Sequence, residues 1–225
     1  MSVVILRSHR HRCPIAMPKN PILWIMLAVV GIGLVWLYLL PGKTTEVAVD
    51  PTTYQTQLAA ERSKKDEFMR TNVDSPIPNK ATFKGLTYFA PDLSFRVRAS
   101  LEPFPEDKRE KLVVKMTDGS EEVYEKYGHA NFTLAGKSCR LLLLTYQKSL
   151  TVLFQDLTAG KESYGGGRYL DIDPKAVDNN AVTLDFNAAY NPYCAYNPTY
   201  ACPLPPPENK LDMAVKAGER YVAHE

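Results

Sequence analysis

From residue 82 onward, apolar and polar side chains alternate along the chain, and this period of two is the feature that most limits its fold. In segment 95–101, apolar residues hold every odd position, and Arg96 and Arg98 lie between them. Such alternation turns one face of a β-strand towards a core and the other towards solvent. Turn signals such as Asp118-Gly119 recur at roughly the 8–12-residue spacing of antiparallel β proteins. We therefore predict a mainly β domain over residues 82–225.

The domain is expected to be an antiparallel β-barrel or β-sandwich of about eight strands. Glycines and short polar stretches separate the candidate strands from one another. The expected strands are 95–101, 111–117, 121–128, 130–136, 138–146, 149–158, 167–173 and 181–187.

A run without any charged residue, 21–40, precedes this domain. About twenty helical residues span the roughly 30 Å of a bilayer core, so the run predicts a transmembrane helix. Residues 1–20 carry bases and no acid, which places them in the cytoplasm by the positive-inside rule. We expect a single-pass anchor in a bacterial inner membrane with an extracytoplasmic, periplasmic β domain. A cleaved signal peptide is the alternative, but no small-residue cleavage site follows the run.

Two further expectations concern the N-terminal part of the chain. Met17 offers a second start, in which case residues 1–16 would not be translated. Residues 41–81 form a linker that contains a short amphipathic helix, because Tyr54, Leu58, Phe68 and Met69 make a thin apolar stripe in the charged segment 54–71.

The charge balance and the glycines exclude several classes of function. The formal net charge is only +2, so we expect no nucleic-acid partner. Gly165, Gly166 and Gly167 are expected to form a structural turn, because neither a phosphate loop nor a dinucleotide fingerprint matches their surroundings. We expect no cofactor and no metal.

Two charged residues share strand faces with apolar neighbours. Asp156 alternates with Val152 and Phe154, and Arg168 alternates with Leu170 and Ile172. Burial of either charge requires a partner, so we predict an Asp156–Arg168 ion pair. A structural role is the favoured interpretation, and anchoring of a ligand by Arg168 is the alternative.

Cys194 and Cys202 are predicted to form a disulfide, because an oxidising compartment allows such a bond to persist. A zinc site is the alternative, although a spacing of eight residues is wide for paired zinc ligands. The segment around these cysteines is rich in tyrosine, and six tyrosines lie within residues 164–200.

Tyrosine combines a flat apolar face with a polar tip, so these rings and the nearby polar residues predict a pocket for a small ligand or an envelope component. A hydrolase with Asp185 and Glu208 as acid and base and Arg168 as oxyanion partner is one alternative, and an envelope scaffold that binds another protein is a second. Whether the protein is an enzyme is left open. The candidate ligand-binding residues are Tyr164, Arg168, Asp185, Asn187, Tyr190, Asn191, Glu208 and Asn209.

Three long motifs resemble the bacterial and archaeal domain-of-unknown-function family 1684. They are "SPIPNKATFKGLTYFAPDLSFRVRASL", "FQDLTAGKESYGGGRYLDID" and "LDFNAAYNPYCAYNPTYACPLPPPENKLDMAVKAGE", and the resemblance covers about residues 60–222. It implies no activity. It singles out the residues of its glycine-rich, Asp-Phe-Asn and cysteine-proline blocks, among them Tyr164, Arg168, Asp185, Asn191, Cys194, Cys202 and Glu208.

Overall fold

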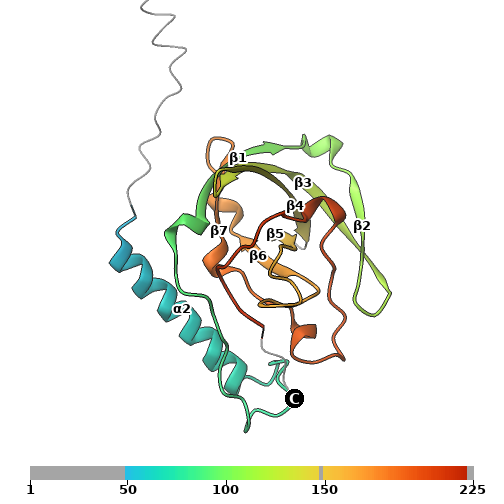
Figure 1. Ribbon diagram of the computed structural model, residues 1–225. Coiled ribbons are helices and arrows are strands. Elements are labelled where there is room, and N and C mark those ends of the chain that lie inside the picture. The colour runs from blue at the N-terminus through green and yellow to red at the C-terminus, as the bar shows by residue number, and fades with distance from the viewer. Residues whose placement is uncertain (1–48, 147–148, 222–225) are drawn as a thin grey trace, which may run out of the picture. The chain divides into compact units, whose positions relative to one another are not determined.

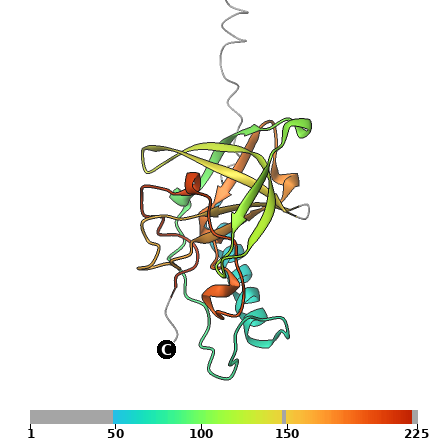
Figure 2. The ribbon, with the colours of Figure 1, turned by 90° about the vertical axis from the view of Figure 1, so that its right-hand side faces the viewer.

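The computed structural model describes residues 49–146 and 149–221, which form one curled antiparallel sheet with a helix beside it (Figures 1 and 2). The sheet has the strand order β6-β5-β4-β3-β1-β7, and β2 pairs with β3 alongside this path. The prediction of a mainly β, antiparallel domain is confirmed. The strands are β1 (Arg96–Pro103), β2 (Lys111–Lys115), β3 (Glu121–Leu134), β4 (Lys137–Tyr146), β5 (Ser149–Phe154), β6 (Arg168–Ile172) and β7 (Ala181–Asp185).

The described residues form seven strands, not the predicted eight, because segments 121–128 and 130–136 make one long strand, β3. Gly128 lies at a bulge within β3 and not at a turn. A Cβ atom on Gly128 would come within 2.5 Å of the Glu102 carbonyl oxygen, so a glycine allows β1 to pass close by. The first half of β3 pairs with β2 and the second half with β1.

The sheet curls into a half-barrel, and a short backbone contact bridges its two ends. Tyr169 on β6 and Tyr190, which follows β7, exchange N–H···O hydrogen bonds of 2.9 and 3.0 Å. The described residues also contain six short 3₁₀ helices, before, between and after the strands: η1 (Leu93–Phe95), η2 (Glu106–Lys108), η3 (Pro174–Ala176), η4 (Phe186–Ala188), η5 (Tyr193–Ala195) and η6 (Pro207–Asn209).

Both faces of the central strand β4 are covered. Leu141 and Leu143 belong to the main core cluster, whereas Leu142 and Leu144 belong to a second cluster on the opposite face. All four side chains are fully buried. This burial explains why β4 is a continuous apolar run and does not alternate.

Helix α2 (Pro51–Thr71) extends the predicted 54–71 helix by one turn at its N-terminus. Asp50 caps it by accepting a 2.7 Å hydrogen bond from the Thr53 amide, and Pro51 suits the first helical position because that residue has no hydrogen-bonded N–H to lose. Tyr54, Leu58 and Met69 are its buried residues. The Tyr54 hydroxyl lies 2.9 and 3.0 Å from the two Asp185 carboxylate oxygens, which fixes the helix beside the end of β7.

The predicted cytoplasmic tail 1–20 and transmembrane helix 21–40 lie outside the described residues and stay predictions. Within the part of the chain that the structure describes, no helix has the length and apolar character needed to cross a bilayer.

The segment that follows Cys202 lies along two strands and pairs with their backbones. Along β2, the Leu204 amide donates to the Lys115 carbonyl (2.8 Å) and the Thr117 amide donates to the Cys202 carbonyl (2.9 Å). Beyond β5, Gln155 exchanges hydrogen bonds with Asn209 and Leu211 at 3.0 and 2.8 Å. Figure 1 shows this orange-to-red segment passing across the hollow side of the sheet.

Candidate binding site

The predicted ion pair between Asp156 and Arg168 is confirmed. The Arg168 guanidinium lies 2.7 Å from an Asp156 carboxylate oxygen, and the two side chains are only 1% and 2% exposed. Arg168 also donates to the backbone carbonyls of Val215 (2.8 Å) and Ala217. The second Asp156 oxygen accepts the Val215 amide at 3.1 Å. The pair therefore ties the irregular C-terminal segment to the sheet.

Three of the candidate ligand-binding residues are buried asparagines whose amides hold backbone. Asn209 accepts the Leu142 amide (2.7 Å) and donates to the carbonyls of Leu142 and Leu153 (2.9 Å each). Asn187 makes a reciprocal pair with the backbone of Asp92, and Asn191 donates to the Arg220 carbonyl and to the Glu219 carboxylate. Each side chain is at most 1% exposed, and their assignment to ligand binding stays a prediction.

The two candidate catalytic carboxylates have separate sets of partners. Asp185 accepts from Tyr54 and lies 3.5 Å from Arg96, whereas Glu208 lies 2.9 Å from His129. Arg168 in turn binds Asp156, so Asp185, Glu208 and Arg168 each have a different partner. The structure thus does not bring the three candidate catalytic residues into one described group, and neither carboxylate lines the two cavities described next.

A cavity of about 550 Å³ lies between the C-terminal half of α2 and the tyrosine-rich loop. We call it the large cavity. Two of its tyrosines, Tyr193 and Tyr200, are 36% and 37% exposed, and their rings meet edge to face with centroids 5.5 Å apart. Its lining consists of Lys65, Phe68, Met69, Tyr169, Tyr190, Pro192, Tyr193, Tyr200, Ala201 and Cys202.

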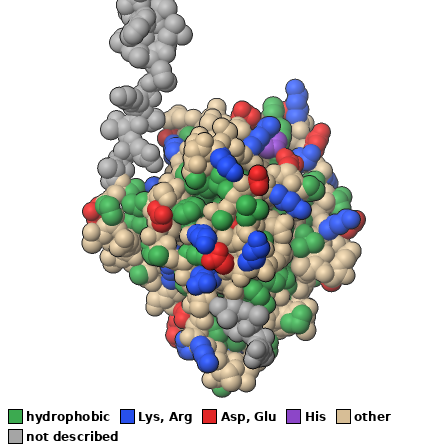
Figure 3. Space-filling model, viewed as in Figure 1, with side chains coloured by type: hydrophobic (Ala, Val, Ile, Leu, Met, Phe, Trp, Pro, Cys, Tyr) green, Lys and Arg blue, Asp and Glu red, His purple; other side chains and the backbone are tan. Residues whose placement is uncertain are grey.

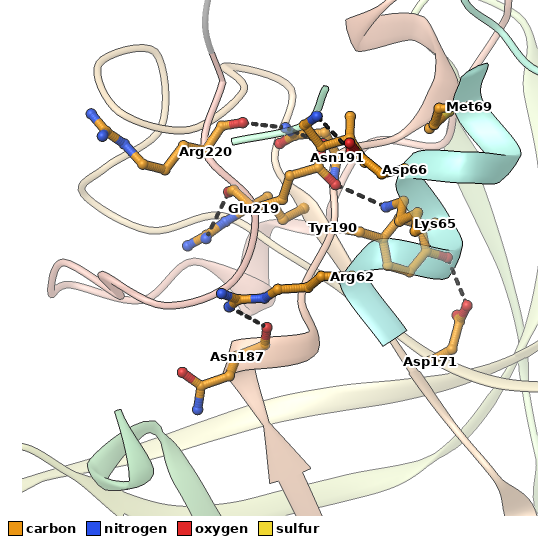
Figure 4. A network of polar contacts seen from close by, with 12 residues as sticks. Arg62, Lys65, Asp66, Met69, Asp171, Asn187, Tyr190, Asn191, Glu219 and Arg220 are labelled. Carbon is orange, nitrogen blue, oxygen red and sulfur yellow. Dashed lines mark hydrogen bonds and ion pairs between the residues drawn. The ribbon is translucent and has the colours of Figure 1, made fainter. Parts of the chain in front are cut away.

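Lys65 is the charged residue of this lining, and its charge is balanced within the protein (Figure 4). Its ammonium nitrogen lies 2.8 Å from the Glu219 carboxylate and 4.4 Å from the centroid of the Tyr190 ring. Glu219 is 1% exposed, and burial raises the pKa of its carboxyl, while Lys65 acts in the opposite direction. The helix therefore supplies both a wall of the cavity and the counter-ion of a buried acid.

A second hollow of about 260 Å³, here called the small cavity, shares Tyr169 and Tyr190 with the large one. The Tyr190 hydroxyl donates to Asp171 at 2.7 Å (Figure 4). Burial raises the pKa of Tyr124, Tyr169 and Tyr190, so these phenols remain neutral over the ordinary pH range. The lining consists of Tyr124, Tyr146, Ser149, Thr151, Leu153, Tyr169, Asp171, Tyr190 and Pro203.

The predicted disulfide is absent, because Cys194 and Cys202 are both free thiols in the structure. The Cys202 sulfur instead accepts the Cys194 backbone amide at 3.1 Å, and the Cys202 amide donates to Thr117 at 3.0 Å. The neighbouring Cys202 thiol, and to a smaller extent the Tyr164 hydroxyl, lower the pKa of the Cys194 thiol to about 7. Polar contacts of the reduced sulfurs therefore hold this loop where a covalent bond was expected.

The glycines after Tyr164 form a turn. The Gly167 amide donates to the Tyr164 carbonyl at 3.0 Å, and Gly167 has a φ of +94°, in the region that favours glycine. A Cβ atom on Gly167 would lie 2.7 Å from the Phe154 carbonyl oxygen. Tyr164 itself packs edge to face against Tyr221 and lines neither cavity. Among the described residues, no group of three or more potential metal ligands occurs.

The sequence pattern pointed to the tyrosines but missed the helix. Tyr190 is the one candidate ligand-binding residue that lines both cavities, and other tyrosines of the same loop join it in the large one. Lys65, Phe68 and Met69 enter the site because α2 packs against that loop. The apolar stripe of 54–71 signalled that the helix docks, but it did not indicate where.

Residues 81–220 match the model of a family described as "Protein of unknown function (DUF1684)". The chain is also similar to an uncharacterised protein of Haloarcula marismortui whose structure was solved by solution NMR. The two share 39% sequence identity and a TM-score of 0.60, over 75% of this chain and 95% of that one. No curated protein matches the chain.

Proposed function

The chain belongs to the family of proteins of unknown function DUF1684, and for this member we propose a binding function: it holds a small, flat, mostly apolar molecule in the large cavity. The observation that carries the proposal is the combination of a volume of about 550 Å³ with a lining of aromatic rings. Ligand sites commonly measure about 300–1,000 Å³ and are lined mainly by apolar and aromatic side chains with few polar groups.

The chemistry of the lining supports a neutral ligand. Four tyrosines, Phe68 and Met69 offer ring faces, ring edges and a polarizable thioether, which are suited to a flat apolar body. Lys65 is the lining residue with a full charge, and Glu219 balances it at 2.8 Å. An anionic ligand would have to compete with a carboxylate that is already in place.

The accessibility of the rings also supports binding. Tyr193 and Tyr200 are more than one third exposed, whereas Tyr190 and Tyr196 of the same loop are half-buried. A ligand that covered these two rings would remove apolar surface from water without disturbing the core. Figure 3 shows apolar side chains at several places on the molecular face seen there, interspersed with charged side chains of both signs.

The test is a titration of the full chain with indole as a flat, neutral probe, followed by ligand-observed NMR. Tyr193→Leu and Tyr200→Leu should each weaken binding roughly three- to tenfold, the range expected for the loss of one aromatic contact. Tyr127→Leu is the matched control, because Tyr127 is a half-buried tyrosine that lines neither cavity. Indole binding that is equally strong in all three variants, or no binding at millimolar indole, would overturn the proposal.

A further inference from the structure

The small cavity differs from the large one in how its aromatic rings are arranged. Tyr124 and Tyr146 stack with centroids 4.8 Å apart and an interplanar angle of 29°. Tyr169 and Tyr190 meet edge to face with centroids 5.8 Å apart. Four tyrosine rings therefore surround a hollow of about 260 Å³. The face of an aromatic ring carries partial negative charge.

Hydrogen bonds of the tyrosine hydroxyls hold these rings in place. Tyr190 donates to Asp171 (2.7 Å), Tyr169 donates to the Pro203 carbonyl (2.6 Å), and Tyr124 donates to Glu122 (3.2 Å). Phenols that donate to carboxylates and carbonyls become richer in electron density, which strengthens the negative field at their rings. These ring surfaces are therefore held in place before a ligand binds, and the hydroxyl protons of these three tyrosines are already engaged in hydrogen bonds.

The formal charge of the lining has the same sign as the ring faces. Asp171 is the lining residue with a full charge, and it is exposed. The Tyr190 hydroxyl binds one of its two carboxylate oxygens. The electrostatic potential of the hollow therefore favours a cation and disfavours an anion.

The structure already contains one cation on a ring that the two cavities share. The Lys65 ammonium lies 4.4 Å from the centroid of Tyr190, and Lys65 lines the large cavity but not the small one. Because Glu219 balances the charge of Lys65, this ammonium does not set up a net repulsion against a second cation. Tyr190 is thus a ring that accepts positive charge in this fold.

We propose that the small cavity binds an organic cation of the methylated-ammonium class, held by the faces of the tyrosine rings with Asp171 as counter-ion. Such a group needs no hydrogen-bond acceptors, and aromatic rings recognise it through cation–π attraction. A metal ion would require several oxygen or nitrogen ligands, and the described residues offer no group of three or more. The same chemistry occurs in a free small molecule and in a lipid headgroup.

The first experiment is calorimetric titration of the full chain with choline and with 3,3-dimethylbutan-1-ol, the neutral carbon analogue of the same shape. Choline should bind at least about tenfold more tightly than the analogue, because only choline gains from the ring faces and from Asp171. Asp171→Asn, an exposed substitution that leaves the fold intact, should weaken choline binding and leave the analogue unaffected. Equal affinity for both compounds, or no choline binding at millimolar concentration, would overturn the inference.

Substitutions of single tyrosines show in which cavity the cation binds. Tyr124→Leu should weaken choline binding about tenfold, whereas Tyr124→Phe, which keeps the ring, should stay within about twofold of the unchanged protein. Tyr193→Leu is the matched control, because Tyr193 lines the large cavity alone. If Tyr193→Leu abolishes choline binding and Tyr124→Leu does not, the cation occupies the large cavity and the inference fails. The indole titration is read out separately, so either proposal can fail without the other.

Co-sedimentation with vesicles then distinguishes the two sources of the cation. If the source is a lipid headgroup, the chain should sediment with phosphatidylcholine vesicles more than with phosphatidylglycerol vesicles, and choline should compete. If the source is a free molecule, choline should bind in solution without any preference between the vesicles. Stronger sedimentation with phosphatidylglycerol, insensitive to Asp171→Asn, would contradict cation recognition at this site.

Discussion

The surroundings of Arg168 and the large cavity both contain irregular backbone, but their side chains are arranged in opposite ways. Around Arg168, charged and amide side chains are about 1% exposed and bind carbonyls and amides of the chain itself. Beside α2, the rings of Tyr193 and Tyr200 are over one third exposed and border the open space of the cavity. The buried polar groups hold irregular backbone in position, and the aromatic rings enclose the hollow that this backbone creates.

The difference follows from the cost of burial. An irregular segment has backbone groups without partners in a sheet, and an unpaired buried polar group costs about 1–3 kcal/mol. The side chains of Asn209 and Arg168 supply the hydrogen bonds that these backbone groups lack. A tyrosine needs a partner only for its hydroxyl and can leave its ring in a cavity.

Arg168→Met should produce the largest effect. The variant leaves Asp156 buried without its cation and removes donors from the Val215 and Ala217 carbonyls. Breaking a buried pair in this way typically lowers the free energy of unfolding by about 3–5 kcal/mol. Urea unfolding of the full chain measures this loss of unfolding free energy. Tyr200→Leu, on the other side of the comparison, should change stability by no more than about 0.5 kcal/mol. Similar losses of unfolding free energy in the two variants would contradict the difference between the two regions.

Asn209→Asp should have an intermediate effect. The acid can still accept the Leu142 amide, but it loses the two donors that reach the carbonyls of Leu142 and Leu153. Two unsatisfied carbonyls and a buried acid should lower the free energy of unfolding by about 2–3 kcal/mol near neutral pH. Part of this loss should be recovered at pH 4, where the new acid is protonated. A variant as stable as the unchanged protein at pH 7 would show that Asn209 is not a structural tie.

The smallest expected effect is a shift in the pH dependence of Cys194 alkylation. Cys194 contacts Cys202, and Cys202 lines the large cavity. With its pKa lowered to about 7, alkylation of Cys194 should rise with pH and reach half of its maximum near pH 7, since the thiolate is the nucleophile. Cys202→Ala should move this midpoint upwards, and Tyr164→Phe should do so by less. The rates are measured with iodoacetamide in a chain that carries Cys13→Ser and Cys139→Ser. A midpoint at the ordinary value of about 8.5 would contradict the contact between the thiols.

Much of the fold could be predicted from local pattern. In the predicted strand 181–187, alternation puts Val182, Leu184 and Phe186 on one face, and all three are fully buried. The boundary predicted between segments 130–136 and 138–146 is confirmed, because β3 and β4 meet at Gly136. The boundary predicted after Gly128 is wrong, since a glycine at a bulge and a glycine at a turn have the same neighbours in sequence. Only the approach of β1 to Gly128 distinguishes the two cases.

The candidate site was harder to predict, because it depends on long-range packing. The asparagines and acids near the tyrosines in sequence turn towards backbone that lies far away along the chain, such as Leu142 for Asn209. Lys65 reaches the site from more than a hundred residues upstream and meets Glu219 there. No periodicity within either segment carries that information.

The prolines after Cys202 have a consequence for how this protein behaves among other chains. Residues 202–204 pair with the outer edge of the chain at the C-terminal end of β2, from Lys115 to Thr117. Pro203, Pro205, Pro206 and Pro207 have no N–H, and the Leu204 N–H is already bound to Lys115. Residues 203–207 therefore offer no free backbone N–H with which another strand could pair at this edge. The prolines that make this loop rigid thus also hinder a strand of a neighbouring molecule from pairing with the sheet at this edge.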